Sequence, residues 1–396
     1  MATSAPAPPA FSPVAEALAA NRLGVPQVVF FVMSAATPLT VVAGVVTTAY
    51  GATGLLGLPA AFGVVGLLLG LFSVGYVAMA REVGNCGAFY AYLARGLGRP
   101  AGVAGAWVAL LAYNGLQIGL YGAVGAAVSP LLRQWFGLAP PWWVIALIAW
   151  ALTATLGLLR VDVNGRLLAV LLLTEVAVIV VFSVADLRHP AGGAVSFAAL
   201  SPGTLLGPGV GALLVLAVLG SVGFESAVVF SEESRHPNRT VPLATYLSVG
   251  LIAALYMFAS WAMTVAVGPD RIVGVAREQG TEVIFTLARA QLGPAAATTG
   301  HALFATSLLA AMIAFHNTTS RYMYALGREG VLPQRWGRTS AATGAPHIAS
   351  LTQSALGLVV IVVFAVAGWD PLVTLFYRAG TGGGLGVLLL IAATSI

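Results

Sequence analysis

Two glutamates lie inside long apolar runs of this sequence. Glu225 follows the glycine-marked stretch GSVGF, and Glu175 lies within LLLTEVAVIV. A carboxylate at bilayer depth is costly and is usually kept for a task such as proton transfer. For each residue, a glutamate held by hydrogen bonds for structural reasons alone is an equally good interpretation. We expect Glu225 to take part in proton coupling or to hold a cationic substrate group, with Glu175 as a second intramembrane acid.

The composition around these acids is that of a membrane protein. Of 396 residues, 59% are hydrophobic and 8% are charged, whereas a soluble chain carries about a quarter charged residues. No charged residue occurs between Arg22 and Arg81, which leaves room for two membrane spans and a turn. The sequence therefore predicts an all-α polytopic membrane protein in a lipid bilayer. The arginines lie between apolar runs, so we expect them to set orientation rather than to bind nucleic acid.

Ten hydrophobic spans are predicted from length and flanking charge. They cover roughly residues 27–50, 54–80, 101–129, 142–160, 166–185, 208–232, 242–268, 295–317, 346–368 and 372–396. The last span reaches Ile396 without a polar stop. We therefore expect helix 10 to be truncated.

Arginine placement and span count predict the topology and the domains. With a cytoplasmic N-terminus, twelve arginines fall inside and five outside, which the positive-inside rule favours. We expect a cytoplasmic tail (1–26), a first repeat of helices 1–5 (27–185), an external loop (186–207) and a second repeat of helices 6–10 (208–396). The polar stretch 81–98 is predicted to form a short surface helix.

Spans one and six contain breaks at corresponding places in the two halves. In span one, Pro38 lacks an N–H and disfavours helix at the residue before it. In span six, Gly220 and Gly223 precede Glu225. Taken singly, the first reads as a proline kink and the second as a glycine packing face. Together, interrupted spans in two repeats point to a transporter site, where half-helix N-termini face anionic groups and freed carbonyls face cations.

Polar residues on two other spans are weaker candidates. Asn114, Gln117 and Tyr121 share one face of span three. Hydrogen bonds to a neighbouring helix are the commoner role there, and contact of Asn114 or Gln117 with substrate is the alternative. Near the end of span eight, His316 could shuttle protons and Asn317 could approach the helix-1 break, but structural roles are commoner for both.

Three segments resemble the amino acid–polyamine–organocation (APC) superfamily of permeases. GSVGFESAVVFSEESRHPNRTVPLA is similar to that family's sixth-helix signature. NCGAFYAYLARGLGRPAGVAGAW resembles the stretch from helix 2 into helix 3, and NTTSRYMYALGREGVLPQRWGR resembles the end of helix 8. The resemblance covers nearly the whole chain from about residue 25. It implies the five-plus-five inverted repeat of the leucine-transporter group, with helices 1 and 6 discontinuous.

The resemblance also implies the residues of the site. The substrate would be bound by the main chain around the two breaks, with Phe224 as a gate, at Ser34, Ala35, Ala36, Thr37, Ser221, Gly223 and Phe224. Related permeases often place an ionisable residue on helix 5, where a sodium ion can sit between helices 1, 5 and 8 in the leucine-transporter group, so Glu175 would be a proton carrier there. Where many members have a Gly-x-Gly break whose amides take the substrate carboxylate, this chain has SAATP.

The function that follows is secondary active transport of an amino acid or related amine across the plasma membrane of a prokaryote, coupled to protons. A sodium-coupled symporter or exchanger of the same fold is one alternative, and a channel or substrate sensor is another. The sequence has no metal-ligand set, phosphate loop or nucleophile–base pair, so we expect neither an enzyme nor a cofactor. Cys86 is the lone cysteine, which excludes an intrachain disulfide.

Overall fold

The computed structural model describes residues 14–15, 17–83 and 86–396 and is almost entirely helical. Most of the predicted tail 1–26, and part of the polar stretch 81–98, lie outside these residues. Within them, nine helices are long and apolar enough to cross a membrane, and α7 is a shorter apolar helix of 16 residues. These ten helices occur where the ten spans were predicted, and they confirm an all-α polytopic membrane protein.

The elements follow one another along the chain with short connections. They are β1 (Val14–Ala15), α1 (Val25–Ala35), α2 (Pro38–Thr40), η1 (Val41–Val45), α3 (Val46–Thr53), α4 (Leu58–Glu82), α5 (Phe89–Gly96), α6 (Arg99–Phe136), α7 (Trp142–Gly157), α8 (Val161–Arg188), η2 (Ala198–Leu200), η3 (Pro202–Leu205), α9 (Val210–Ser221), η4 (Phe224–Glu233), α10 (Pro237–Val267), α11 (Ile272–Gln279), η5 (Gly280–Glu282), α12 (Val283–Leu292), α13 (Pro294–Arg328), η6 (Gln334–Gly337), β2 (Thr339–Ser340), α14 (His347–Ala367), η7 (Pro371–Ala379) and α15 (Gly380–Thr394).

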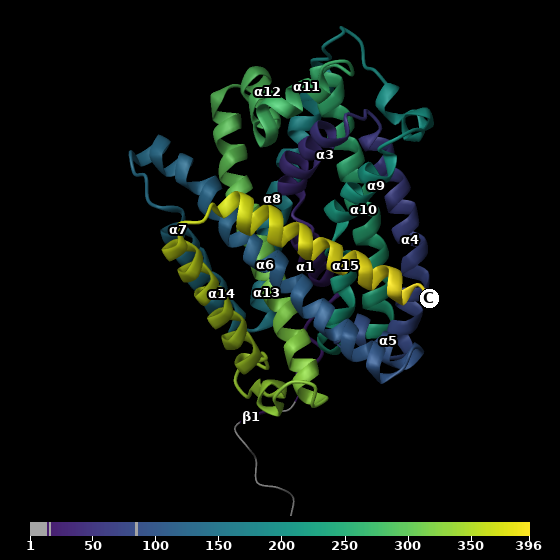
Figure 1. Ribbon diagram of the computed structural model, residues 1–396, viewed down its shortest axis with the longest axis vertical. Coiled ribbons are helices and arrows are strands. Elements are labelled where there is room, and N and C mark those ends of the chain that lie inside the picture. The colour runs from purple at the N-terminus through teal and green to yellow at the C-terminus, as the bar shows by residue number, and fades with distance from the viewer. Residues whose placement is uncertain (1–13, 16, 84–85) are drawn as a thin grey trace, which may run out of the picture.

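Several of these elements combine into single membrane crossings. Helix 1 comprises α1, α2, η1 and α3, and helix 6 comprises α9 and η4. The tenth crossing, η7 with α15, has 24 residues and packs across α6 (Figure 1). The predicted short helix after α4 is present as α5, whose aromatic side chains Phe89, Tyr90 and Tyr92 are buried.

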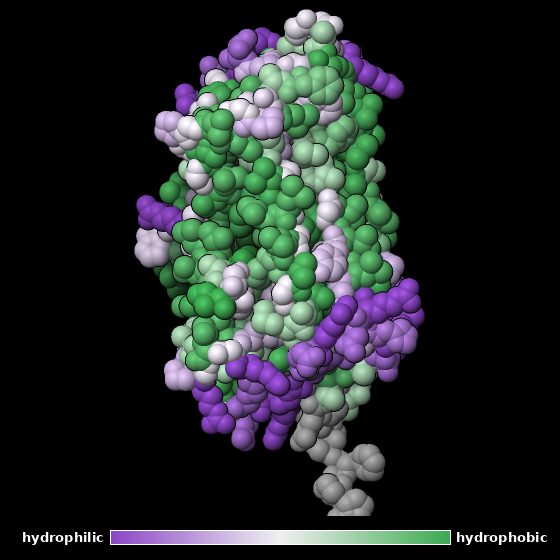
Figure 2. Space-filling model, turned by 90° about the vertical axis from the view of Figure 1, so that its right-hand side faces the viewer, coloured by the Kyte–Doolittle hydropathy of each residue, from purple (hydrophilic) through white to green (hydrophobic). Residues whose placement is uncertain are grey.

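The surface has the pattern expected of a protein surrounded by lipid. Figure 2 shows a broad apolar belt with hydrophilic residues gathered toward the two ends. Large apolar side chains on α4 and α8, such as Leu67, Leu71 and Val170, are exposed. An apolar belt of this kind is unfavourable in water, whereas it matches the hydrocarbon core of a lipid bilayer.

Helix 1 lies at the centre of the bundle, since the buried side of α1 packs against α8, α10, α13 and η4. Residues 25–53 form one of the most enclosed of the candidate spans. A polar break in such a helix is therefore hidden from lipid and can face only protein or an internal cavity.

The end of the molecule that carries the N-terminal segment is held closed by polar contacts. The backbone N–H groups of Arg22 and Leu23 donate to the carbonyl oxygen of Glu233 at 2.8 and 3.0 Å. The buried Arg321 guanidinium donates to both carboxylate oxygens of Glu233, at 2.5 and 2.8 Å. We call this set the N-terminal clasp: residues 22–23, Glu233 and Arg321. It joins the start of helix 1, the end of helix 6 and helix 8.

Candidate functional site

The helix-1 break is a full interruption between α1 and α2. Thr37 adopts φ 47° and ψ 64°, a left-handed conformation that is uncommon for a β-branched residue. Pro38 then starts α2 without an N–H to satisfy. On the other side of the break, the hydroxyl of Tyr256 on α10 donates to the carbonyl oxygen of Ala36 at 2.7 Å. The helix-1 break is therefore stabilised by a side chain from another helix, α10.

The helix-6 break depends on glycine for two reasons. Gly223 has φ 119°, which only glycine adopts without strain. A Cβ atom at this position would lie 2.9 Å from the amide nitrogen of Ala36 and 3.0 Å from the carbonyl carbon of Ala35. The two breaks, 187 residues apart in sequence (223 − 36), therefore lie against each other.

Glu225 is fully buried directly after this second break. Its Oε2 accepts a hydrogen bond from the backbone N–H of Gly223 at 2.8 Å, and its Oε1 accepts one from the Tyr113 hydroxyl at 2.9 Å. The Tyr76 hydroxyl donates to the Glu225 carbonyl oxygen at 3.1 Å. The carboxylate thus occupies the start of η4, where unpaired N–H groups favour negative charge.

Glu175 occupies the corresponding place at the helix-1 break. From α8, its Oε1 accepts hydrogen bonds from the backbone N–H of Leu39 and from the Ser307 hydroxyl, the latter at 2.7 Å. Ser307 lies on α13 and is also 3.2 Å from the Thr40 hydroxyl. One carboxylate oxygen therefore links helices 1, 5 and 8, the three helices named by the sequence-based prediction.

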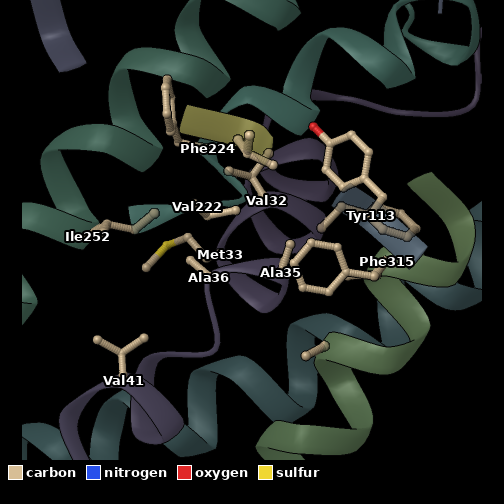
Figure 3. Packing of buried hydrophobic residues seen from close by; sticks show 14 of the residues in the cluster. Val32, Met33, Ala35, Ala36, Val41, Tyr113, Val222, Phe224, Ile252 and Phe315 are labelled. Carbon is tan, nitrogen blue, oxygen red and sulfur yellow. The ribbon is translucent and has the colours of Figure 1, made fainter. Parts of the chain in front are cut away.

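A cavity of about 190 Å³ opens beside the two breaks. Its lining includes Ala35, Ala36 and Thr37 from the first break, and Val222 from the second. Further residues of helices 1 and 6 extend these two walls, and helices 3, 8 and 10 contribute the rest, including Leu116, Leu120, Phe315, Phe376 and Thr381. Figure 3 shows Ala35 beside the ring of Phe315, with Ala36 and Val222 next to it. The walls are predominantly apolar.

The predicted site residues divide into those that reach this cavity and those that pack behind it. Ala35, Ala36 and Thr37 line it, whereas Ser34, Ser221 and Gly223 lie in the breaks but outside the lining. Phe224, predicted as a gate, is buried and packs edge-on against Phe72 of α4, with 6.0 Å between ring centroids. In Figure 3 its ring extends away from Ala35 and Phe315.

The polar candidates on helices 3 and 8 are also outside the lining. The Asn114 side-chain amide donates to the Leu110 carbonyl at 2.8 Å, and that of Gln117 to the Tyr121 hydroxyl at 3.2 Å. His316 Nε2 lies 2.8 Å from the Ser350 hydroxyl. Asn317 Oδ1 accepts from Arg321 at 2.9 Å and therefore belongs to the N-terminal clasp region. Each of these side chains has a helix-to-helix or local bond.

Some residues of the site had no clear sequence signal. Tyr256 and Ser307 belong to no motif in their spans, and their importance comes from contacts with helix 1 and with Glu175. Phe376 and Thr381 enter the cavity wall from the tenth crossing, where a glycine run beginning at Gly380 was the available hint. Among the described residues, no group of three or more His, Cys, Asp or Glu side chains could hold a metal ion.

Comparisons with known proteins agree with this architecture. The chain is similar to MhsT in complex with L-phenylalanine, with a TM-score of 0.63 and 16% identity over 96% of this chain and 89% of that one. It is also similar to the Eremococcus coleocola manganese transporter in complex with an aromatic bis-isothiourea substituted compound, with a TM-score of 0.59 and 16% identity over 93% and 78%. These likenesses confirm the predicted leucine-transporter-like fold. A search of curated proteins found no match.

Together these observations describe a multi-pass membrane protein with the fold of secondary transporters. The model of the amino acid permease family matches residues 23–394, nearly the whole chain, and the chain therefore belongs to this family.

Proposed function

We propose that this protein carries an amino acid or related amine across the plasma membrane by alternating access, driven by a proton gradient. The observation that carries the proposal is the meeting of two helix breaks at one cavity, with a buried glutamate at the start of each second half-helix. Repeat-related broken helices at a midplane cavity are the usual substrate site of such transporters. The similarity to a structure holding L-phenylalanine supports a substrate of this size.

Proton coupling is the function we propose for the two glutamates. Glu175, on helix 5, bonds to helices 1 and 8 through one oxygen, and Glu225 bonds to Gly223 in its own break and to Tyr113 of helix 3. Gain or loss of a proton on either group changes which of these bonds exist, and so biases how the helices pack. Sodium coupling remains the alternative, because the Glu175 region lies between helices 1, 5 and 8.

We further propose that the N-terminal clasp faces the cytoplasm, with 27–185 and 208–396 as the two repeats. The support is the twelve-to-five arginine bias described above. Ala35, Ala36 and Thr37 would contact substrate directly, while Ser34, Ser221, Gly223 and Phe224 would shape the breaks. Asn114 and Gln117, whose side-chain amides bond within helix 3, would shape the helix-3 wall of the site.

Uptake into proteoliposomes tests the proposal. Radiolabelled amino acids and amines would be offered under an imposed pH gradient, an imposed sodium gradient, or neither. We expect saturable accumulation under the pH gradient alone. Accumulation that follows sodium would exclude proton coupling, and failure to accumulate any amino acid or amine would exclude the proposed transport function.

A further inference from the structure

We propose that the substrate is a monoamine with an apolar body and no carboxylate. The inference rests on the transport function proposed above and narrows its substrate class. A charged group of the substrate that is bound away from water must find a partner at the cavity beside the two breaks.

The amides around the helix-1 break already have acceptors within the protein. The N–H of Ala36 donates to Val32 O at 3.1 Å, and that of Thr37 donates to Ser34 O at 3.2 Å. The next residue is Pro38, which has no N–H, and the Leu39 N–H is held by Glu175. These are the groups that a carboxylate would use at an exposed half-helix start.

The helix-6 break is occupied in the same way. The Gly223 N–H donates to Glu225 Oε2 at 2.8 Å, and the Val222 N–H donates to Leu219 O at 3.3 Å. The Ser226 N–H is bonded to Gly223 O at 3.0 Å. A glutamate carboxylate already accepts from the amides of Leu39 and Gly223, so a substrate carboxylate would meet like charge beside these occupied amides.

No cationic side chain among the described residues lines the cavity to balance the charge of a substrate carboxylate. None of the residues that line the cavity is arginine or histidine, and the chain contains no lysine. Arg378 lies next to a lining residue in sequence, but it is exposed and does not line the cavity. A bound carboxylate would therefore lack an ion-pair partner and the occupied amides named above, and would depend on hydroxyl donors such as Thr37 and Thr381.

An ammonium group, in contrast, finds several acceptors. The first half-helices α1 and α9 both end at the cavity, so the negative ends of their dipoles lie beside it, and a carbonyl oxygen that already accepts one hydrogen bond can accept a second. Thr37 and Thr381 add hydroxyl oxygens, and the rings of Phe315 and Phe376 offer aromatic faces to a cation. Glu175 and Glu225, just behind the breaks, add to the attraction.

Most of the remaining lining side chains are apolar, and they favour a substrate with one apolar body over a substrate with a second charge. Leu116, Leu120, Leu216, Leu219 and Val45 present only hydrocarbon to the cavity. A second ammonium group on the substrate would find no acceptor on these side chains and would have to reach the hydroxyls of Thr40, Thr48 or Tyr377. Alkyl- and arylalkyl-monoamines therefore fit this lining, and diamines are expected to bind more weakly.

Matched pairs of compounds test the inference on the full-length protein. Phenethylamine and phenylalanine, and isoamylamine and leucine, would be compared by competition and by direct uptake in proteoliposomes, with putrescine as the diamine. We expect each monoamine to bind about tenfold or more tightly than its amino acid, since an unpaired buried charge is strongly unfavourable. Equal or tighter binding of the amino acids would overturn this inference and leave the proposed function intact, whereas uptake of neither class would overturn both.

A charge-insertion variant gives a second readout. Thr381→Arg places a guanidinium at the cavity wall, and Thr298→Arg, at a half-buried threonine of α13 outside the lining, is the control. We expect Thr381→Arg to shift the preference from the monoamine toward the amino acid, and Thr298→Arg to leave it unchanged. If Thr381→Arg folds with an unaltered preference, the cavity does not read substrate charge and the inference fails.

Discussion

The two helix breaks look alike but are closed by different means. Each has a residue with positive φ and a carboxylate at the start of the following half-helix. At the helix-6 break the carboxylate is Glu225, two residues after Gly223. At the helix-1 break it is Glu175, 136 residues away from Leu39 on another helix. A proton on Glu225 therefore acts within helix 6 and on Tyr113, whereas a proton on Glu175 acts on the packing of three helices.

The two breaks also differ in the strain of their backbone. Gly223 adopts its positive φ without strain, while Thr37 holds a left-handed conformation that costs of order 1 kcal/mol or more. The helix-1 break is thus the strained one, held by Tyr256 and Glu175 from outside. The helix-6 break is relaxed, and the carboxylate that accepts from its amide comes from helix 6 itself. Four substitutions test this contrast, ordered by their expected effect on the free energy of unfolding.

The largest effect is expected for Gly223→Ala. The added Cβ would lie 2.9 Å from Ala36 N, and alanine disfavours φ 119°. We expect a loss of about 3 kcal/mol, measured as a large drop in Tm in detergent, together with loss of uptake. Gly211→Ala on α9 is the control, because a Cβ there meets nothing within 4 Å. A stable, active Gly223→Ala protein would show that the breaks do not need this close approach.

Glu225→Gln should come second. The two donors at Glu225 reach different oxygens, so an amide, with one oxygen, keeps one bond and must turn its NH₂ toward the other donor. We expect a loss of about 1–2 kcal/mol and weakened proton-driven accumulation. Transport with an unchanged pH dependence would exclude Glu225 from coupling.

Tyr256→Phe should cost about 1 kcal/mol, because it removes the only hydroxyl described at the Ala36 carbonyl while keeping the ring in place. The exposed Tyr246 supplies the matched change, Tyr246→Phe, for which no loss is expected. Thermal unfolding of the two variants side by side is the measurement. Equal stabilities would mean that the helix-1 break does not rely on this outside support.

The smallest effect on stability is expected for Glu175→Gln. Both donors at Glu175 reach the same oxygen, Oε1, so the glutamine carbonyl can accept both bonds. We expect a change within about 0.5 kcal/mol, yet uptake that no longer responds to a pH gradient, because glutamine cannot carry the proton. Retained proton-driven accumulation in a folded Glu175→Gln protein would assign coupling elsewhere.

The same contrast explains what the sequence could predict. The spans follow from hydrophobic length, and both breaks follow from local signals, namely Pro38 and Gly223. The relation of Glu225 to its break is also local, because it lies two residues after the glycine. Glu175 could be recognised as an intramembrane acid, but its bonds to Leu39 and Ser307 arise only when three helices pack.

The direction of the side chains after the helix-6 break could not be predicted from the sequence. Helix 6 continues after Gly223 as a 3₁₀-helix, η4, with about three residues per turn rather than 3.6. That changes the face on which each residue emerges. Phe224 accordingly packs against Phe72 rather than lining the cavity, and the tenth crossing supplies aromatic wall residues instead.

The N-terminal clasp has a consequence for the speed of the transport cycle. Arg321 and Glu233 are each 1% exposed, so dissolved salt cannot screen their attraction. Separating them in a dry interior would leave two unsolvated charges. This end can therefore open only if water reaches Arg321 and Glu233 while the backbone of residues 22–23 separates from helix 6. Turnover should then depend steeply on temperature and little on ionic strength.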